Sequence, residues 1–336
     1  MTIIKNNKVA IWGLGKHALK NILPAVHITE GLEIYGVFSR DKEIVKECCK
    51  KWNCKSWNTI EDMLLDSNLD IIYLATPTGL HYEHGLKVLQ SNKHLWCEKP
   101  FTTNLEKTQN LIDISNKRNL SVCEGFMYLY HPQFEKLKEY IDKKGLGKIK
   151  SIYCRFGLPT LDNPGFRFNQ KLGGSCLLDV GSYPVSAILC LFYEKEIEIV
   201  DSNLSISDEY SVDLWGRAHL KIDSEIECIL EWAYNRAYRN DIDIWGKKGC
   251  LYTDKIFSKN SDYEPNFQVR DLYGNLLTID IDSKNHFELM LKSFSGTIGD
   301  VNKTNQQRER ILKLAVLLDQ IKYNNSTTLK KKNKYV

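Results

Sequence analysis

Short apolar runs alternate with amphipathic stretches through the first third of the chain. The apolar runs lie at residues 8–12, 33–38, 70–75, 94–97 and 120–123, and helical patterns follow at 42–51, 82–90 and 105–117. Short buried strands separated by helices at this regularity are typical of a parallel, doubly wound sheet. We therefore predict an α/β domain with a doubly wound parallel sheet over residues 1–125.

From about residue 147 the pattern changes to consecutive strands with short turns, at 149–158, 197–205, 212–222, 225–235 and 241–245. In the run 225–235 alternate residues from Ile226 to Tyr234 are apolar and share one face. One apolar helix, within 173–192, interrupts the strands. We expect an α+β domain over 126–325 with a large, mostly antiparallel open sheet. Its other face also carries apolar residues such as Ile229 and should be covered, for example by another subunit.

Composition describes an ordinary globular protein, with 43% hydrophobic and 26% charged residues in 336. The net charge of +4 belongs to the end of the chain, where four lysines lie in the last seven residues. We expect residues 326–336 to be a basic, disordered tail, and we expect no nucleic-acid partner.

No apolar run approaches the roughly 18 residues of a membrane span. The start of the chain has no secretory signal pattern, so we expect a cytoplasmic protein without a membrane partner. The ten cysteines should then be reduced, as scattered structural thiols.

The first strand pattern leads into Gly13-Leu14-Gly15-Lys16-His17-Ala18, and a helix follows. This G-x-G-x-x-A sequence between a strand and a helix is the dinucleotide-binding fingerprint. Gly13 permits a tight turn, Gly15 lets the backbone approach a pyrophosphate, and Ala18 allows close packing. The helix N-terminus supplies free N–H groups, so we expect Gly13, Gly15, Lys16 and His17 to contact the cofactor.

The second strand ends in Ser39-Arg40-Asp41. A site that prefers NAD usually has an acidic residue at this strand end to bind the ribose hydroxyls. Ser39 and Arg40 instead suit the 2′-phosphate of NADP, while Asp41 is better placed to cap the following helix. We expect NADP as the cofactor, with NAD as the less favoured alternative.

The fourth apolar run ends in Glu98-Lys99-Pro100. In open α/β sheets ligands bind beyond the carboxyl ends of the strands, so Lys99 is either a site residue or one of a pair of surface charges. Pro100 follows a lysine and could have a cis peptide bond. The third run ends in Thr76-Pro77, which could line the same crevice. His81 either joins this crevice or only decorates the helix 82–90, and with His84 it provides too few ligands for a metal, so we expect none.

The apolar helix of the second half carries Asp179 and Tyr183, four residues apart and thus on one helix face. Tyr183 could be a core residue whose hydroxyl bonds Asp179, or, beside a lysine, a proton donor in a site. Arg155 and Arg167 lie in or near the loop 159–172 and could meet an anionic diphosphate, although a solvated loop explains them equally well. Tyr238 belongs to an aromatic and basic group that could line the substrate side or simply stack within the sheet.

Together, the glycine fingerprint, Ala75-Thr76-Pro77, Glu98-Lys99-Pro100 and the segment Gly-Gly-x-x-x-x-Asp-x-Gly-x-Tyr-Pro (173–184) resemble the Gfo/Idh/MocA oxidoreductases. The resemblance covers nearly the whole chain. It implies a Rossmann domain followed by a domain whose open sheet often forms the subunit interface, and hence a homodimer or homotetramer. It also implies that Lys99 is the catalytic lysine and that Asp179 orients this lysine or the substrate.

Many members of that family have a histidine where this chain has Tyr183. The tyrosine resembles the glucose–fructose oxidoreductase, dihydrodiol dehydrogenase and deoxysugar ketoreductase branches, which generally favour NADP. The chain departs from its relatives at Leu129, where they often carry a basic residue, so one substrate or cofactor contact could be absent.

These residues predict hydride transfer between the nicotinamide and a carbon of a sugar or a nucleotide-linked sugar. Tyr183 would exchange the proton, with Lys99 and Asp179 beside it. The remaining residues expected to line the cofactor site are Thr76, Pro77, His81, Glu98 and Lys99. Oxidation of a cyclic diol or free sugar is an alternative. From other classes of function, a non-catalytic NADP-binding regulator and an NAD-dependent glycosidase stay open.

Overall fold

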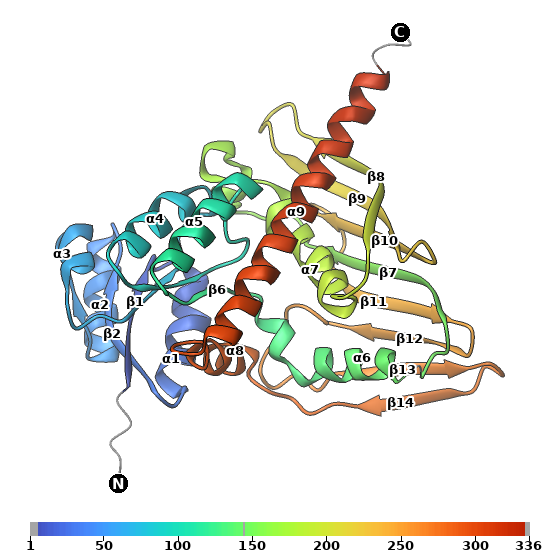
Figure 1. Ribbon diagram of the computed structural model, residues 1–336, viewed down its shortest axis with the longest axis horizontal. Coiled ribbons are helices and arrows are strands. Elements are labelled where there is room, and N and C mark those ends of the chain that lie inside the picture. Colours follow the sequence, from blue (N-terminus) through green and yellow to red (C-terminus); the bar gives the residue numbers. More distant parts are fainter. Residues whose placement is uncertain (1–5, 144, 333–336) are drawn as a thin grey trace. The chain divides into compact units, whose positions relative to one another are not determined.

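The structure, a computed structural model, describes the backbone of residues 6–143 and 145–332 and the side chains up to residue 324. It divides into two compact units (Figure 1). The first unit contains residues up to Phe126 together with Phe287–Leu312, and the second contains Met127–His286 and the residues from Lys313 onward.

The first unit is built on a six-stranded parallel sheet, which confirms the predicted Rossmann-type arrangement. Its strand order is β3-β2-β1-β4-β5-β6. From β1 the chain therefore first adds β2 and β3 on one side of the sheet and then β4, β5 and β6 on the other. The strands are β1 (Asn7–Trp12), β2 (Leu32–Phe38), β3 (Lys55–Ser56), β4 (Ile71–Leu74), β5 (His94–Cys97) and β6 (Val122–Glu124). The central strand β4 is buried at every position, because helices cover both faces of a parallel sheet.

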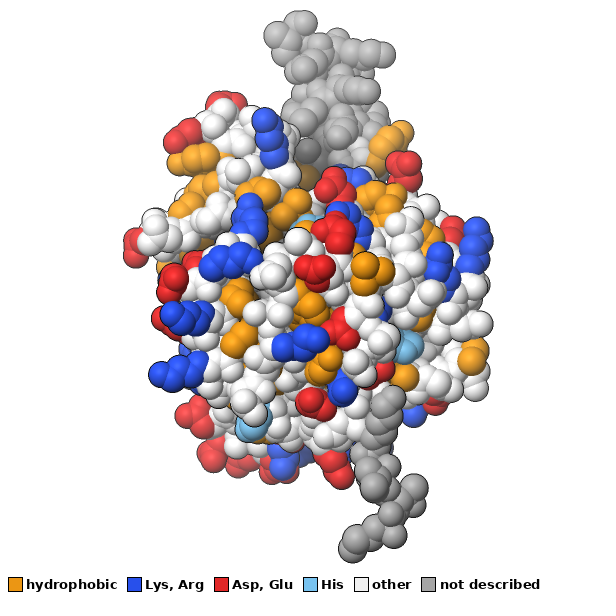
Figure 2. All heavy atoms as spheres, turned by 90° about the vertical axis from the view of Figure 1, so that its left-hand side faces the viewer, with side chains coloured by type: hydrophobic (Ala, Val, Ile, Leu, Met, Phe, Trp, Pro, Cys, Tyr) orange, Lys and Arg blue, Asp and Glu red, His pale blue; other side chains and the backbone are white. Residues whose placement is uncertain are grey.

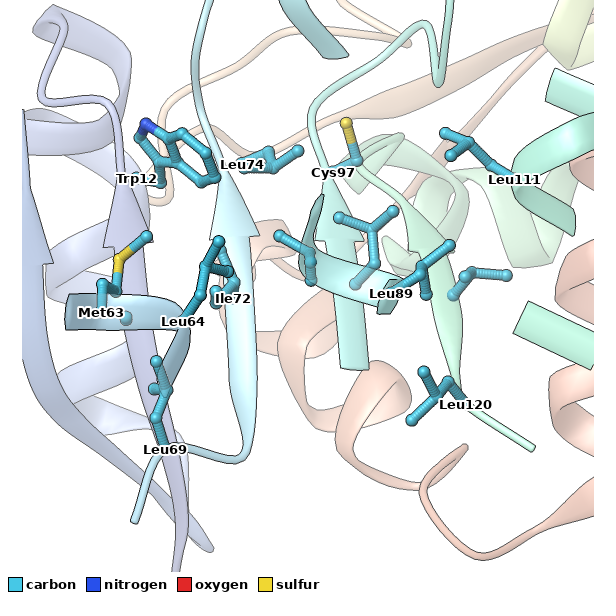
Figure 3. Packing of buried hydrophobic residues seen from close by; sticks show 14 of the residues in the cluster. Trp12, Met63, Leu64, Leu69, Ile72, Leu74, Leu89, Cys97, Leu111 and Leu120 are labelled. Atoms are coloured by element: carbon cyan, nitrogen blue, oxygen red, sulfur yellow. The ribbon is translucent and has the colours of Figure 1, made fainter. Parts of the chain in front are cut away.

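Alternate residues of these strands face two different sets of helices. Trp12, Leu74 and Cys97 pack in one cluster with residues of α3 (Ile60–Leu65), α4 (His81–Gln90) and α5 (Leu105–Lys117), part of which Figure 3 shows. Trp96 points to the other face, where its ring contacts that of Phe294 in α8 (His286–Ser295). The unit also contains α1 (Leu23–Ile28) and α2 (Lys42–Trp52). On the surface seen in Figure 2, lysine and arginine side chains lie interspersed with aspartate and glutamate.

The expected domain boundaries differ from the structure at the C-terminal end. Residues 287–312, from α8 and the start of α9 (Val301–Lys332), belong with the first unit rather than with the second. The buried Arg308 of α9 explains this, since its guanidinium donates to Ser115 Oγ at 3.0 Å and to the Leu120 carbonyl at 2.9 Å. The expected disordered tail from residue 326 is helical as far as Lys332, and residues 333–336 lie outside the described part.

The second unit contains an eight-stranded sheet in the order β14-β13-β12-β11-β7-β10-β9-β8. Only β7 and β10 pair in parallel, so the sheet is mostly antiparallel, as predicted. The strands are β7 (Ile149–Gly157), β8 (Ile197–Ile206), β9 (Asp213–Ile222), β10 (Ile226–Ala233), β11 (Arg239–Gly246), β12 (Gly249–Asp254), β13 (Asn266–Asp271) and β14 (Leu276–Asp280).

Helices cover one face of this sheet. Gln133 of α6 (Pro132–Asp142) donates through Nε2 to Thr253 Oγ1 of β12 at 2.8 Å. The segment Leu177–Gly181 is π-helical and continues into α7 (Ser182–Leu191), in which nearly every residue is buried. The stretch Gln170–Leu191 is long and apolar enough to cross a membrane by composition, but 83% of its apolar window is buried in the structure. Such burial is what the core helix of a folded domain shows.

Candidate functional site

The residues predicted to hold a cofactor in the first unit begin where β1 and β4 end. The strand order reverses between these neighbours, which is the position where ligands bind in open α/β sheets. Gly13 follows β1 with a φ of +106°, and a Cβ there would lie 2.7 Å from the Ala75 carbonyl oxygen. A Cβ on Gly15 would meet no atom within 4 Å. Gly13 therefore closes the turn, while the absent side chain of Gly15 leaves open space in front of the loop.

The helix after this loop presents its N-terminus at the same place. The backbone is helical without a break from Lys16 to Ile28, with its middle turn π-helical, and Leu19 N donates to Gly15 O at 3.1 Å. The first N–H groups of such a helix and its dipole favour an anion. Lys16 is exposed at this end. The loop thus has the space and the donors that a pyrophosphate requires.

The end of β2 has the arrangement that the sequence predicted. Asp41 caps α2, because its carboxylate accepts from Glu43 N at 3.1 Å and from Ile44 N at 3.2 Å. Ser39 Oγ accepts from Asp41 N, and Arg40 is exposed. The acidic group of this strand end is therefore engaged by the helix, and the two residues before it carry a hydroxyl and an exposed cation.

His84 lies among these groups, although the sequence had not placed it in the site. Its ring stacks on Trp12 at 4.1 Å, and its Nδ1 is 3.2 Å from Thr76 Oγ1. Burial lowers the pKa of His84 to about 4, with smaller contributions from the charges of His81, Lys87 and Arg40. His84 is thus neutral at pH 7 and lies between Trp12 at the end of β1 and Thr76 just after β4.

His81 has a different position from the one expected of a cofactor ligand. It is 1% exposed, and its two ring nitrogens lie 2.9 Å from the Pro100 carbonyl and 2.8 Å from the Thr76 carbonyl. Burial lowers its pKa, and the two carbonyl groups oppose this effect. Because both nitrogens are engaged, His81 braces the loops after β4 and β5 instead of reaching a ligand.

Glu98, directly after β5, contacts both β4 and the helix that follows the glycine loop. Its Oε1 accepts from Tyr73 Oη at 2.6 Å and lies 3.0 Å from His17 Nε2. Asn21 Nδ2 donates to His17 Nδ1, which leaves the proton of a neutral ring on Nε2, directed at Glu98. Burial would raise the pKa of Glu98, but His17, Tyr73 and the charge of Lys99 together lower it. Glu98 is therefore ionised at the strand end next to Lys99.

A second acid, Glu124 at the end of β6, lies under the turn that follows Lys99. The turn begins with a cis peptide bond between Lys99 and Pro100, as the sequence had suggested. Phe101 N donates to Glu124 Oε1 at 2.7 Å. Glu124 is 2% exposed, and burial raises its pKa to about 7. The only sign of this role in the sequence is an acid that directly follows a buried strand.

In the second unit Tyr183 lies in an aromatic cluster. Its ring centroid is 5.0 Å from that of Phe156, 5.5 Å from Phe257 and 5.8 Å from Tyr128. Tyr183 Oη is 3.8 Å from Met127 Sδ. The side chain is 7% exposed. The rings fix the position of the phenol at the first turn of α7.

Asp179 has two partners within the second unit that the sequence had not indicated. Its Oδ2 accepts from Arg167 Nε at 2.6 Å and from Tyr234 Oη at 2.8 Å. The hydroxyl of Tyr234 is thus one partner of Asp179. The charge of Asp179 raises the pKa of Arg167, and Tyr183 adds to this effect. The structure brings Asp179, Arg167 and Tyr183 into one neighbourhood. Tyr234, which the sequence left open between the substrate side and stacking within the sheet, belongs to it through its bond to Asp179.

Of the predicted substrate contacts, Arg155 lies on the strand face opposite Tyr183, and Tyr238 lies beside Asn240. Phe156 packs on Tyr183, so its neighbour Arg155 points to the opposite face of β7, where it bonds Asp241 with Nε–Oδ1 at 2.8 Å. Tyr238 accepts from Asn240 Nδ2 at 2.8 Å and is half exposed. The period-two alternation of a strand, which sequence reasoning had not applied to Arg155, accounts for the first difference.

Comparisons with known proteins agree with both units. Residues 7–126 match the model of an oxidoreductase family with an NAD-binding Rossmann fold, and residues 134–252 match the GFO/IDH/MocA C-terminal domain. The crystal structure of KijD10, a 3-ketoreductase from Actinomadura kijaniata in complex with NADP and TDP-benzene, is similar with a TM-score of 0.91. It is 23% identical and covers 95% of this chain and 98% of its own, which supports the shared fold.

Two enzymes are similar in sequence over most of their length. The dTDP-3,4-didehydro-2,6-dideoxy-alpha-D-glucose 3-reductase of Saccharopolyspora spinosa is 25% identical over 257 residues, covering 76% of this chain and 77% of the enzyme. The trans-1,2-dihydrobenzene-1,2-diol dehydrogenase of Xenopus laevis is 28% identical over 220 residues, covering 65% and 66%. With the glycine loop at the reversal of the strand order and both family domains matched, the chain belongs to the Gfo/Idh/MocA family of oxidoreductases.

Proposed function

We propose that this protein is an NADP-dependent oxidoreductase that acts on a CH–OH or keto group of a sugar, and specifically of a nucleotide-linked sugar. The observation that carries the proposal is the position of Tyr183. Its phenol is held by three aromatic rings at the start of α7, next to the pair of Asp179 and Arg167. A fixed phenol beside polar groups is suited to exchanging a proton with a substrate oxygen.

The residues of the first unit fit a dinucleotide with a 2′-phosphate. The space in front of Gly15 and the helix N-terminus at Lys16 would hold the pyrophosphate. At the β2 end, Asp41 is engaged as a helix cap, which leaves Ser39 and Arg40 for the 2′-phosphate. Their arrangement supports NADP over NAD, and the NADP complex of the 3-ketoreductase KijD10 agrees with it.

In the proposed reaction the bound nicotinamide supplies or accepts the hydride. During reduction Tyr183 donates its proton to the oxygen of the keto group, and Lys99 stabilises the negative charge that develops there. Glu98, which is ionised through its bonds to Tyr73 and His17, holds the start of the turn that carries Lys99. Asp179 acts by fixing Arg167, and through it the surroundings of the phenol.

The preferred substrate is a keto sugar linked to a nucleoside diphosphate. The similarity to dTDP-sugar 3-reductases supports this class, and Arg167 offers a cation to an anionic substrate. The similarity to dihydrodiol dehydrogenase supports a cyclic diol as a second candidate. The physiological direction of transfer depends on which of them is used.

A substrate panel tests the proposal. Nucleotide-linked keto sugars, free sugars and cyclic trans-diols are each incubated with the protein and with either nicotinamide cofactor in the matching redox state, and the nicotinamide absorbance is followed. We expect turnover with nucleotide-linked keto sugars and NADPH, with a lower rate for NADH. Tight binding of NADPH without turnover of any compound would favour a non-catalytic regulator. Hydrolysis of a glycoside without net change in absorbance would favour an NAD-dependent glycosidase.

Self-association through the sheet of the second unit remains part of the proposal. Tyr153 on β7 and Trp245 on β11 are 46% and 67% exposed on the face opposite the buried Ile152 and Ile244. Exposed aromatic residues on an open sheet face are suited to pairing with a second copy of the chain. Light scattering of the purified protein distinguishes monomer, dimer and tetramer. A location in the cytoplasm stays a prediction from the sequence.

A further inference from the structure

The C-terminal end of α2 brings two cysteines together. Asn53 follows the helix with left-handed backbone angles (φ 49°, ψ 47°), and Cys54 N donates to the Cys49 carbonyl at 3.3 Å. This is the hydrogen bond of a Schellman motif, in which the residue two positions beyond the helix contacts the residue in its last turn. That contact is usually made by two apolar side chains. Here both positions carry thiols.

The two thiols are free, and each is partly exposed. The Cys49 side chain is a hydrogen-bond partner of the Cys54 thiol. Burial and the neighbouring Cys49 raise the pKa of Cys54 to about 12, so Cys54 keeps its proton and can donate it toward the Cys49 sulfur. Cys49 is then the sulfur that can react first. Cys48, the next residue, is 4% exposed and faces the interior.

The charged residues around the pair are mostly basic. Lys50 and Lys51 follow Cys49 on α2, and Lys55 follows Cys54 at the start of β3, where it bonds Asp66 at 2.5 Å. Cations near a thiol favour the thiolate, which is the reactive form. The negative end of the helix dipole and Glu47 act in the opposite direction. Cys49 itself is partly exposed, so a small oxidant can reach its sulfur.

We propose that Cys49 and Cys54 are an oxidisable dithiol that closes to an intramolecular disulfide on reaction with a peroxide. The Cys49 thiolate attacks the peroxide, takes one oxygen to become a sulfenic acid, and releases water or an alcohol. The Cys54 sulfur then attacks the Cys49 sulfur, and its proton leaves with the hydroxyl group as water. The two cysteines lose two electrons and two protons in total, and the peroxide is reduced. This site is independent of the proposed function, since it lies at the end of α2 opposite the Asp41 cap.

Peptide mapping tests the proposal on the full-length protein. The reduced protein is treated with hydrogen peroxide, remaining thiols are blocked with N-ethylmaleimide, and the chain is cut with trypsin, which cleaves after Lys50 and Lys51. We expect the peptide that contains Cys49 to stay joined to the peptide that contains Cys54, and dithiothreitol to separate them. The joined species should be lost in Cys49→Ser and in Cys54→Ser. It should persist in Cys48→Ala, the matched control.

Circular dichroism of the reduced variants checks that each one folds as the parent does. If a variant fails this check, the parent and Cys48→Ala still decide the question, because fragmentation of the joined species identifies the linked sulfurs. The proposal is overturned if peroxide yields no joined species. It is equally overturned if the link involves Cys48, or if both thiols are oxidised separately to sulfinic acids.

Discussion

Phe101 N, two residues after Lys99, donates to the carboxyl group of Glu124 at 2.7 Å. This carboxyl group is almost completely buried. Burial raises its pKa from 4.5 to about 7, while Arg310, the Phe101 N–H and Lys99 oppose the shift. The carboxyl group thus titrates in the native state close to physiological pH, directly beneath the turn that carries the proposed catalytic lysine.

Glu124→Gln should make the stability of the protein less dependent on pH. Because the folded pKa lies above the unfolded one, the contribution of the neutral acid is complete below pH 4.5 and is lost as the pH rises through about 7. The loss is on the order of 3 kcal/mol for the full shift. Urea unfolding from pH 5 to 8 should show the free energy of unfolding falling with pH in the parent and less in Glu124→Gln. Glu30→Gln, an exposed control, should follow the parent. Equal slopes for parent and Glu124→Gln would show that the acid is ionised throughout.

Gly13→Ala and Gly15→Ala should separate folding from cofactor binding. At Gly13 the positive φ and the 2.7 Å approach of the Ala75 oxygen make a Cβ strained, so we expect a loss of stability of about 1–3 kcal/mol. At Gly15 the Cβ enters open space, so the chain should fold normally while affinity for NADPH falls. Thermal unfolding and cofactor titration measure the two effects. Unchanged NADPH affinity in Gly15→Ala would place the pyrophosphate elsewhere.

Arg40→Ala should reduce the preference for NADPH over NADH. Loss of a hydrogen bond between charged groups corresponds to about 1.5–3 kcal/mol, or roughly a 10- to 100-fold weaker affinity for NADPH. NADH affinity should change little, because it lacks the 2′-phosphate. Lys42→Ala removes a nearby cation whose Nζ lies 5.8 Å from the Phe38 ring, and it should keep the preference. A full NADPH preference in Arg40→Ala would exclude this contact.

Lys99→Ala and Tyr183→Phe should each lower turnover on the order of 10²–10⁴-fold while NADPH still binds. Tyr183→Phe removes only the hydroxyl and keeps the ring that packs on Phe156. Steady-state kinetics with the substrate found in the panel, alongside cofactor titration, measures both quantities. Normal turnover in both variants would refute the assigned roles.

Asp179→Asn should destabilise the second unit by about 1–2 kcal/mol, because it weakens the bonds from Arg167 and Tyr234 and leaves the partly buried guanidinium without its counter-charge. Tyr234→Phe removes one of these bonds and should cost about 1 kcal/mol. Denaturant unfolding gives the free energy of unfolding of each variant and of the double variant, and from these the coupling energy between the two substitutions. Additive effects would mean that the two bonds are independent. A loss of turnover in Asp179→Asn that Tyr234→Phe does not share would favour the direct role that the sequence suggested.

The local features of this protein were determined by the sequence alone. The order of strands and helices, the turn at Gly13, the helix cap at Asp41 and the alternation in 226–234 depend on residues close together in the chain, whose backbone preferences and periodicities are readable without a fold. The parallel and mostly antiparallel sheets follow from the same patterns, because neighbouring elements usually pair.

Tertiary structure decided which distant side chains meet. The burial of Glu124 under Phe101, the bond from Tyr234 to Asp179 and the return of 287–312 to the first unit connect residues that are far apart in sequence. No periodicity encodes such pairs, since each depends on how whole elements pack. His81 and Arg155 are further examples, because their residue types suggested a contact with a ligand. Only the packed structure shows two carbonyl oxygens beside the ring nitrogens of His81 and Asp241 beside Arg155.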